Sequence, residues 1–567
     1  MTPKEALKYY FGYDDFRPLQ SEIIASVLEG RDTLALMPTG GGKSICFQVP
    51  TLVMADEDES KRLCLVITPL IALMKDQVEN LRRRGIQAAA IYTGMPIDQQ
   101  RSALDNCLFG PYHFLYCSPE RLESEEFKTR LKTLPIGLIA VDEAHCVSQW
   151  GYDFRPSYLN IQQIRETLPE VPILALTATA TTETIEDIQD KLGFREHHVL
   201  RKSFHRENLT YVVRRTDNKD EQLKHILSKV PGSAIVYVRN RKRAQELSER
   251  LAASGERVDF YHAGLTTKER NERQEAWKKD KTRVIVATNA FGMGIDKADV
   301  RLVIHYDMPS HLESYYQEAG RAGRDGKTAY AVLLFNERED VAKVHKRLAD
   351  TYPPKEFVEQ VYHKTADFLG VGAGSGLGHA FALHMNELCQ VMHLPIVATD
   401  AALHLLANAG YILFEEEQET QARVSINIPS AQLREYNLTA EQEHLLQGLM
   451  RRYPGIFTEL QYLHGEDNPD DTQLHETLAG LAARHIITYI PRTRACMVMF
   501  TKERQTEIWL SPEVYEKRAQ HFEECLRAML EYAQNQQYCR EQVLLDYFGE
   551  HDAIPCGTCD ICRQKVS

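Results

Sequence analysis

The sequence predicts an α/β protein in which two parallel-sheet lobes precede a mainly helical region that ends in a zinc-binding helical hairpin. Three observations support this fold class. Short apolar runs alternate with helical stretches through the first 340 residues, which is typical of parallel sheets covered by helices. A glycine-rich phosphate loop follows the first apolar run, and four cysteines lie close together near the C-terminus. The 567 residues suffice for about three or four domains.

Composition and charge exclude several classes of protein. Hydrophobic residues make up 43% of the chain and charged residues 26%, which is ordinary for a globular protein and unlike a disordered one. No run of about eighteen apolar residues predicts a transmembrane helix, and the first residues show no export signal. We therefore expect a cytoplasmic protein without a membrane partner, associated with the nucleoid if the source is a bacterium.

The net charge of −13 argues against a basic protein that coats nucleic acid. Most of this charge lies in residues 341–567, which hold 20 Lys and Arg against 31 Asp and Glu. Contact with nucleic acid in that part must be local, because the mean field there repels phosphate.

Residues 38–44 read PTGGGKS and follow an apolar run at 34–37. Glycines let backbone N–H groups turn onto phosphate oxygens, and the start of a helix adds partial positive charge. Lys43 can then reach the β- and γ-phosphates, and Ser44 can hold Mg²⁺. The first glycine of the strict motif is missing before this segment, so the match is a variant. The predicted phosphate-binding residues are Thr39, Gly40, Gly41, Gly42, Lys43 and Ser44.

Two acidic residues, Asp142 and Glu143, follow a predicted buried strand at 138–141. An open α/β sheet presents catalytic groups at this end of its strands. Asp142 suits the shell of a Mg²⁺ ion, and Glu143 suits the base that orients or activates water. The alternative is two solvated acids at the start of a helix. The phosphate loop upstream argues against that alternative.

Together with further motifs, these residues resemble the RecQ family of DNA helicases, over residues 1–340 and 511–562. The resemblance implies that both lobes are RecA-like. It also implies that residues 11–20 recognise adenine, with Tyr13 and Arg17 sandwiching the base and Gln20 reading its edge. A ring and a guanidinium group can stack on adenine, and an amide can form two hydrogen bonds with it.

Residues 145–156 read HCVSQWGYDFRP and resemble the aromatic-rich loop that senses single-stranded DNA in this family. Trp150 and Phe154 could stack on bases, and Arg155 could meet a phosphate. The alternative is that both aromatic residues are core anchors. Tyr152 stands where the family usually has histidine, so we assign it no role. Residues 68–77 resemble the first motif that contacts the DNA backbone.

Strands predicted at 233–238 and 284–288 indicate the second parallel sheet. Beyond them, Arg321 and Arg324 are three positions apart, which predicts that they share one face of a helix. The resemblance implies that they are arginine fingers that approach the γ-phosphate from the facing lobe. The alternative is two solvated arginines.

Four cysteines have the spacing C-x16-C-x2-C-x2-C and resemble the zinc-binding hairpin of the family. Short knuckles let thiolates converge on a tetrahedral ion, so we favour structural Zn²⁺ over an iron–sulfur cluster. Ferredoxins carry a fourth cysteine soon afterwards, followed by proline, and none follows here. The predicted ligands are Cys539, Cys556, Cys559 and Cys562.

Residues 345–510 interrupt the resemblance, because the family places the hairpin soon after the second lobe. We therefore expect four domains. They are a first RecA-like lobe that binds ATP (1–205), a second RecA-like lobe (206–344), an inserted region (345–510) and the zinc-binding hairpin (511–567).

The inserted region begins near a glycine-rich linker at 370–376 and contains a predicted repeat in which a helix precedes a two-stranded wing. This pattern indicates two winged-helix-like units, one of which would position or split duplex DNA. Arg492 and Arg494 at the second predicted tip favour that unit, whereas Glu415, Glu416 and Glu417 at the first would repel phosphate. A pair of packing or protein-binding modules is the open alternative. In the first unit, we expect a helix at 401–410 and hairpin strands at 411–414 and 424–428. In the second unit, we expect a helix at 478–485 and hairpin strands at 486–490 and 496–500.

The resemblance implies an ATP-dependent 3′→5′ DNA helicase that acts in DNA repair and recombination and uses ATP, Mg²⁺ and Zn²⁺. Its partners would be single-stranded and forked duplex DNA, with single-strand-binding or recombination proteins, and we expect a monomer. The alternatives are a DNA-dependent translocase that separates no strands and a zinc-stabilised DNA-binding scaffold with an inactive motor. An RNA substrate is also open, because backbone contacts distinguish sugars only where a 2′-OH is read.

Overall fold

The computed structural model describes residues 1–566 except 39, 93–94, 96, 149, 152–153, 293–296, 421, 430–431, 454, 459, 464–471 and 491–492. The chain forms two compact units. The first comprises Met1–Met95, Gln99–Lys343 and His521–Ser567, and the second comprises Pro96–Asp98 and Val344–Gln520. In the described part of the chain, no single helix is long and apolar enough to cross a membrane. Two helices joined at a 110° bend, Met385–Val391 and Ile396–Asn408, meet that test only as a pair.

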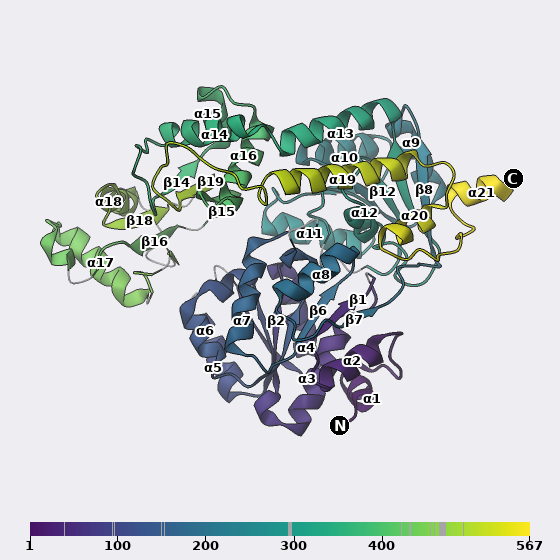
Figure 1. Cartoon of the computed structure of the whole chain (residues 1–567), viewed down its shortest axis with the longest axis horizontal. Helices are drawn as coiled ribbons and strands as arrows, with labels where there is room; N and C mark the ends of the chain where they lie inside the picture. The colour runs from purple at the N-terminus through teal and green to yellow at the C-terminus, as the bar shows by residue number, and fades with distance from the viewer. Residues whose placement is uncertain are drawn as a thin grey trace. The chain divides into compact units, whose positions relative to one another are not determined.

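The first lobe is built on a seven-stranded parallel sheet with the order β3-β4-β2-β5-β6-β1-β7. Alternate residues of β1 face opposite sides, so that Leu34 and Leu36 join one apolar core and Ala35 joins the other. Helices α2, α3 and α4 cover one face, and α5, α6, α7 and α8 cover the other (Figure 1). The strands are β1 (Thr33–Leu36), β2 (Leu63–Ile67), β3 (Gln87–Ile91), β4 (Tyr112–Cys117), β5 (Ile136–Val141), β6 (Ile173–Thr177) and β7 (Val199–Arg201). The helices are α1 (Pro3–Ala6), α2 (Gln20–Leu28), α3 (Ile45–Glu57), α4 (Ile71–Arg83), α5 (Ile97–Phe109), α6 (Glu125–Leu131), α7 (Ile161–Thr167) and α8 (Thr182–Lys191).

The second lobe has a six-stranded parallel sheet with the order β10-β11-β9-β12-β13-β8, as the alternating pattern predicted. Its two faces differ in what covers them. Val212 and Ile304 pack in the core beneath α9 and α10, whereas Tyr211 and His305 contact Tyr315 of α12. The strands are β8 (Leu209–Arg215), β9 (Ser233–Tyr237), β10 (Val258–Tyr261), β11 (Val284–Ala287), β12 (Val300–His305) and β13 (Ala329–Phe335). The helices are α9 (Lys219–Lys229), α10 (Arg241–Ala253), α11 (Thr267–Lys278), α12 (Leu312–Ala319) and α13 (Glu337–Thr351).

The zinc-binding hairpin holds the segment that joins the two lobes. The hairpin comprises the later part of α19 (Glu516–Gln534), α20 (Arg540–Tyr547) and α21 (Asp560–Val566). The Glu550 carboxylate accepts hydrogen bonds from the Ser203 hydroxyl at 2.7 Å and from the Phe204 amide at 2.8 Å. Glu541 accepts one from the Arg206 amide at 3.1 Å. The connection between the lobes is therefore bound in place.

The second unit carries two small antiparallel sheets, with the orders β14-β19-β15 and β17-β16-β18, each beside its own apolar core. The elements α14, β14, α15, α16, β15 and β19 follow one another in the order of a winged helix, with β19 in the middle of the sheet. The glycine-rich segment expected to be a linker lies inside this unit, where Arg504 donates a hydrogen bond to the Val371 carbonyl at 2.6 Å. The helices are α14 (Lys355–Phe368), α15 (Met385–Val391), α16 (Ile396–Asn408), α17 (Ala440–Arg452) and α18 (Thr472–Ala483). The strands are β14 (Ala380–Leu383), β15 (Ile412–Thr420), β16 (Arg423–Ile426), β17 (Gln461–Tyr462), β18 (Ile487–Ile490) and β19 (Thr493–Phe500).

The two predicted helices are confirmed, but the predicted pairing of the wings is wrong. Among the described residues, β15 pairs with β19 and β16 pairs with β18. Thr420 lies opposite Thr493 in the first pairing, and Arg423 lies opposite Ile490 in the second; we call these two strand pairs together the ribbon. Alternation of apolar residues gives the face of a strand but not its partner, which explains the error.

This ribbon changes the position of the charged residues expected at the wing tips. The backbone of Arg494 lies opposite that of Glu419 within the ribbon, so it is not at a free tip. Glu415, expected to repel phosphate, is paired with Arg423 at 2.7 Å. Arg492 and the side chains of Glu416 and Glu417 lie outside the described part of the chain. The predicted hairpin tips are therefore not formed as expected, while strand splitting by this region stays a hypothesis.

Asp32 ties together four segments of the first lobe just before β1. Its buried carboxylate contacts the guanidinium groups of Arg165 at 2.6 Å and Arg195 at 2.9 Å. It also accepts hydrogen bonds from the amides of Ile173 and Arg195. Burial alone would raise the pKa of Asp32, but the hydrogen bonds from Arg195 and Ile173 outweigh that effect and lower it.

Replacing Asp32 with Asn should lower the free energy of unfolding by about 3 kcal/mol at pH 7, because it leaves two partly buried guanidinium groups without their anion. The lowered pKa means that this contribution is present at neutral pH and is lost as the pH falls below the ordinary value of 3.8. Urea denaturation followed by circular dichroism measures the difference. The control is Asp105→Asn, which breaks a half-exposed pair with Arg130 and should cost less than about 1 kcal/mol. Equal losses in both variants would contradict the prediction.

Candidate functional site

The predicted phosphate loop connects β1 to α3 and is shaped by its glycines. Gly40 and Gly42 have φ angles of +79° and +81°, a region that side chains disfavour. A Cβ atom on Gly41 would lie 2.9 Å from the Pro38 carbonyl oxygen, which is too close. The sequence therefore needs glycine at all three positions. Thr39, also expected here, lies outside the described residues.

Two of the predicted adenine-motif residues contact this loop directly. The Arg17 guanidinium donates a hydrogen bond to the Gly40 carbonyl at 2.6 Å, and the buried Gln20 amide donates one to the Gly42 carbonyl at 3.0 Å. The Gln20 side-chain oxygen accepts from the Arg17 amide at 2.8 Å. Tyr13 is half exposed. Arg17 and Gln20 of the motif thus help to position the loop.

Sequence reasoning missed one polar contact to the loop. Gln77 of α4 donates a hydrogen bond to the Ser44 hydroxyl at 3.1 Å. Its segment, 68–77, was expected to contact the DNA backbone. The structure places the last residue of that segment beside the phosphate loop, and the contact with DNA stays a prediction.

Asp142 and Glu143 lie next to each other where β5 ends. The Asp142 carboxylate accepts a hydrogen bond from the Glu143 amide at 3.0 Å. Burial and, second, the neighbouring Glu143 charge together raise the pKa of Asp142 to about 6, while Lys43 of the phosphate loop opposes the rise. Glu143 is buried, has a φ angle of +49°, and one of its carboxylate oxygens has no hydrogen-bond partner. A strained residue with an unsatisfied buried oxygen is typical of a functional site.

A short polar chain connects this acidic pair to β6. His145 lies 3.5 Å from the Glu143 carboxylate and 3.0 Å from the Thr177 hydroxyl. The Thr177 hydroxyl in turn donates to the Thr179 carbonyl at 3.1 Å.

The two predicted arginine fingers are not on a helix, so the expectation of a shared helical face is wrong. Helix α12 ends at Ala319, and both residues lie in the turn that follows, where Gly323 has a φ angle of +65°. Arg324 reaches the phosphate loop of the other lobe, since a Cβ atom on Gly40 would lie 3.4 Å from the Arg324 side chain. Arg321 is buried beside Gly292 in the second lobe.

The aromatic-rich loop is held by the helix that leads into the zinc-binding hairpin. His521 Nε2 of α19 lies 3.0 Å from the Trp150 carbonyl oxygen, and the two rings meet edge to face with centroids 5.5 Å apart. Arg155 donates to the Pro69 carbonyl at 3.5 Å. Trp150 and Phe154 are both half-buried, and positions 149 and 152–153 lie outside the described residues. Nothing in the sequence pattern pointed to His521.

The four predicted zinc ligands converge. The Sγ atoms of all four cysteines lie within 4.8 Å of one another, and the Cys539 sulfur is 3.4 Å from that of Cys556 and 3.9 Å from that of Cys559. Four thiolates around one Zn²⁺ at about 2.3 Å would be about 3.8 Å apart, so the donor set fits this ion. Arg540, next to the first ligand, is buried and paired with Asp560 at 3.1 Å.

Comparisons with known protein families match three parts of the chain. The DEAD/DEAH box helicase model matches residues 17–188, and the model of the helicase conserved C-terminal domain matches residues 218–326. The RecQ zinc-binding model matches residues 499–563, which confirms the predicted zinc-binding hairpin.

Curated relatives and one solved structure agree with these models. The ATP-dependent DNA helicase RecQ of Bacillus subtilis is 45% identical over 336 residues, which is 59% of this chain and 56% of the relative. The protein of the same description from Pasteurella multocida is 41% identical over 350 residues, which is 62% of this chain and 54% of the relative. The matched part thus spans about half the length of these relatives.

The crystal structure of the DUF1998 helicase MrfA bound to DNA superimposes with a TM-score of 0.51 and 18% identity, over 59% of this chain and 51% of that one. This likeness shows the fold alone. The three family models match in the order of the two lobes and the zinc-binding hairpin, and the hairpin contains the four cysteines. These matches and the sequence identity to the curated RecQ proteins point to the same family. On this evidence, the chain belongs to the RecQ family of helicases.

Proposed function

We propose that this protein hydrolyses ATP in response to single-stranded DNA, moves 3′→5′ along that strand and unwinds duplex DNA in repair and recombination. The observation that carries the proposal is the contact of Arg324, from the second lobe, with Gly40 in the phosphate loop of the first. One nucleotide bound to the loop would be touched by both lobes. The direction and the biological process rest on the family.

The proposed reaction uses charges from both lobes. Lys43 and the loop amides bind the phosphates of ATP, and Arg324 and Arg321 stabilise the charge that develops during phosphoryl transfer. Glu143 orients the attacking water and accepts a proton from it. Asp142 and Ser44 would hold Mg²⁺, which neutralises phosphate charge when it is bound.

The proposed coupling to DNA runs through contacts that already exist between the loops. His145 joins Glu143 to Thr177, and the aromatic-rich loop follows directly in sequence. DNA that stacks on Trp150 or Phe154 would move this loop and with it the Glu143 carboxylate. Hydrolysis removes the γ-phosphate that draws the lobes together, so each cycle can shift one lobe along the strand.

ATP hydrolysis measured with single-stranded DNA, with RNA and with no oligonucleotide tests the proposal. We expect stimulation by DNA and a loss of about a thousandfold in kcat for Arg324→Ala, because arginine fingers contribute about that much. Lys43→Ala should abolish hydrolysis altogether. Arg338→Ala is the matched control, since Arg338 is exposed on α13 of the same lobe.

A rate of ATP hydrolysis that does not change when any oligonucleotide is added would refute a DNA-driven motor. Stimulation of ATP hydrolysis by RNA but not by DNA would show that RNA is the substrate. DNA-stimulated hydrolysis without unwinding of a forked duplex would instead establish a translocase that separates no strands.

The acidic pair should reduce the stability of the ligand-free protein. The raised pKa of Asp142 means that its charge destabilises the fold above about pH 6, and that this penalty fades as the pH falls toward 3.8. Asp142→Asn should therefore raise the melting temperature by about 3 °C at pH 8 with a chelator present, and by less at pH 5. Differential scanning calorimetry measures the shift, with Asp105→Asn as the control. A lower melting temperature at pH 8 would contradict this account.

His521 should act as a positioning residue for the aromatic-rich loop. His521→Ala removes the hydrogen bond to the Trp150 carbonyl, so the ratio of DNA-stimulated to basal hydrolysis should fall about fivefold, the value of one hydrogen bond. His521→Gln, which can still donate, should restore most of the ratio. Glu523→Ala on the exposed side of the same helix is the control. An unchanged ratio in His521→Ala would show that the contact is passive.

A further inference from the structure

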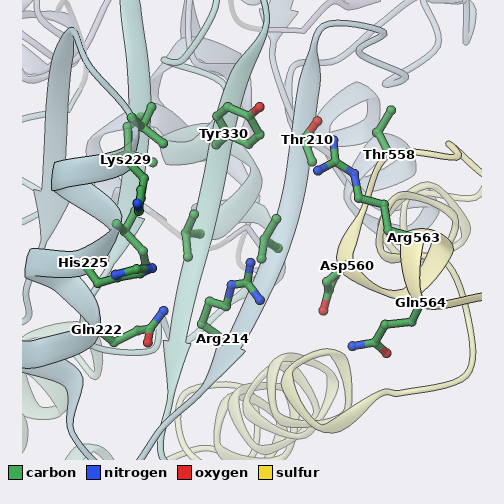
Figure 2. A pocket seen from close by; sticks show the side chains of 15 residues that line it. Thr210, Arg214, Gln222, His225, Lys229, Tyr330, Thr558, Asp560, Arg563 and Gln564 are labelled. Carbon is green, nitrogen blue, oxygen red and sulfur yellow. The ribbon is translucent and has the colours of Figure 1, made fainter. Parts of the chain in front are cut away.

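The second lobe contains a hollow of about 650 Å³ that no step of the proposed reaction uses. It lies over the edge of the sheet, between α9 on one side and α21 of the zinc-binding hairpin on the other (Figure 2). Strands β8, β12 and β13 form its floor. Helix α9 and helix α21 therefore act as two walls with a stretch of sheet open between them.

The floor and the rim of this hollow differ in chemistry. Val212, Leu302 and Val332 line the floor and are buried in the lobe. Arg214 and Lys229 are exposed at the rim. His225 and Arg563 are also exposed rim residues, so basic side chains come from the sheet, from α9 and from α21. Figure 2 shows His225 and Lys229 on one side of the hollow and Arg563 on the other.

The described lining contains little negative charge to oppose Arg214 and Lys229. Asp560 is the acidic residue among the lining residues, and its carboxylate is paired with the buried Arg540 at 3.1 Å. Because that charge is already compensated, the hollow presents a net positive surface over an apolar floor. The complementary ligand is negatively charged and carries apolar groups.

The hollow is separate from the proposed ATP site. Val212 faces it, whereas its neighbour Tyr211 points to the opposite face of the sheet and contacts Tyr315 of α12. The turn that carries Arg321 and Arg324 follows α12. The sheet itself therefore stands between the hollow and the arginine fingers.

Single-stranded nucleic acid is the less suitable anion for this surface. Such strands bind on platforms of aromatic side chains that stack on successive bases. Among the described residues that line the hollow, Tyr330 is the one large aromatic ring, and the remaining apolar lining is aliphatic. Aliphatic floors instead accept leucine, isoleucine or phenylalanine side chains, and a basic rim accepts carboxylates.

We propose that this hollow is a docking site for an acidic peptide segment of a partner protein, one in which Asp or Glu residues alternate with large apolar residues. The apolar side chains of the segment fill the floor over Val212 and Val332. Its carboxylates pair with Arg214 and Lys229, and Arg563 closes the site from the wall formed by α21. This partner would attach to the motor without entering the ATP site.

Selection from a displayed library of random twelve-residue peptides against the full-length protein tests the proposal. We expect enrichment of acidic peptides with apolar residues, and a loss of about tenfold or more in their affinity for the double variant Arg214→Glu with Lys229→Glu. Arg563→Glu, on the opposite wall, should weaken the same peptides. Lys224→Glu is the matched control, because Lys224 is exposed on α9 but does not line the hollow.

Each variant is used only after its DNA-stimulated ATP hydrolysis and melting temperature match those of the unmodified protein. If the double variant does not meet this criterion, Arg563→Glu replaces it in the binding experiment. Fluorescence anisotropy of a synthesised enriched peptide and of a labelled oligothymidylate distinguishes the ligands. Loss of oligonucleotide binding with unchanged peptide binding would overturn the proposal in favour of nucleic acid. Absence of any enriched peptide, or equal binding to all variants, would also overturn it.

Discussion

The repulsion between two neighbouring carboxylates, Asp142 and Glu143, is the electrostatic constraint around which the site is built. Burial and the neighbouring Glu143 charge raise the pKa of Asp142 to about 6, and one oxygen of Glu143 lacks a hydrogen-bond partner. Such an arrangement is costly unless positive charge is near. Lys43 supplies some of it within the first lobe, and Arg324 of the second lobe lies beside Gly40 of the phosphate loop. The need for compensating charge thus favours a closed arrangement of the lobes when a ligand is bound.

Parallel strands explain why so much of the first lobe could be predicted from sequence. Each buried strand is a short apolar run, and the loops at the carboxyl ends of such strands meet at one edge of the sheet. The phosphate loop after β1 and the acidic pair after β5 were therefore located from local patterns. The cysteine cluster was equally accessible, because its spacing is itself the signature of the metal site.

Features that depend on contacts between residues distant in sequence could not be predicted from local patterns. The ribbon of β15, β16, β18 and β19 joins residues more than sixty positions apart, and local alternation is equally consistent with two separate wings. Arg321 and Arg324 have helical spacing, but Gly323 adopts a left-handed conformation that ends any helix there. His521 lies 371 positions from Trp150, and a single histidine on an amphipathic helix carries no sign of its partner.

The grip of the zinc-binding hairpin on the segment between the lobes has a mechanical consequence. Glu550 holds Ser203 and Phe204, while the Arg201 side chain at the end of β7 donates a hydrogen bond to the Phe548 carbonyl. These hydrogen bonds leave less of the connection free to bend if the lobes move. A Zn²⁺ ion held by the four cysteines would therefore also stiffen the connection between the two lobes, without taking part in the proposed hydrolysis.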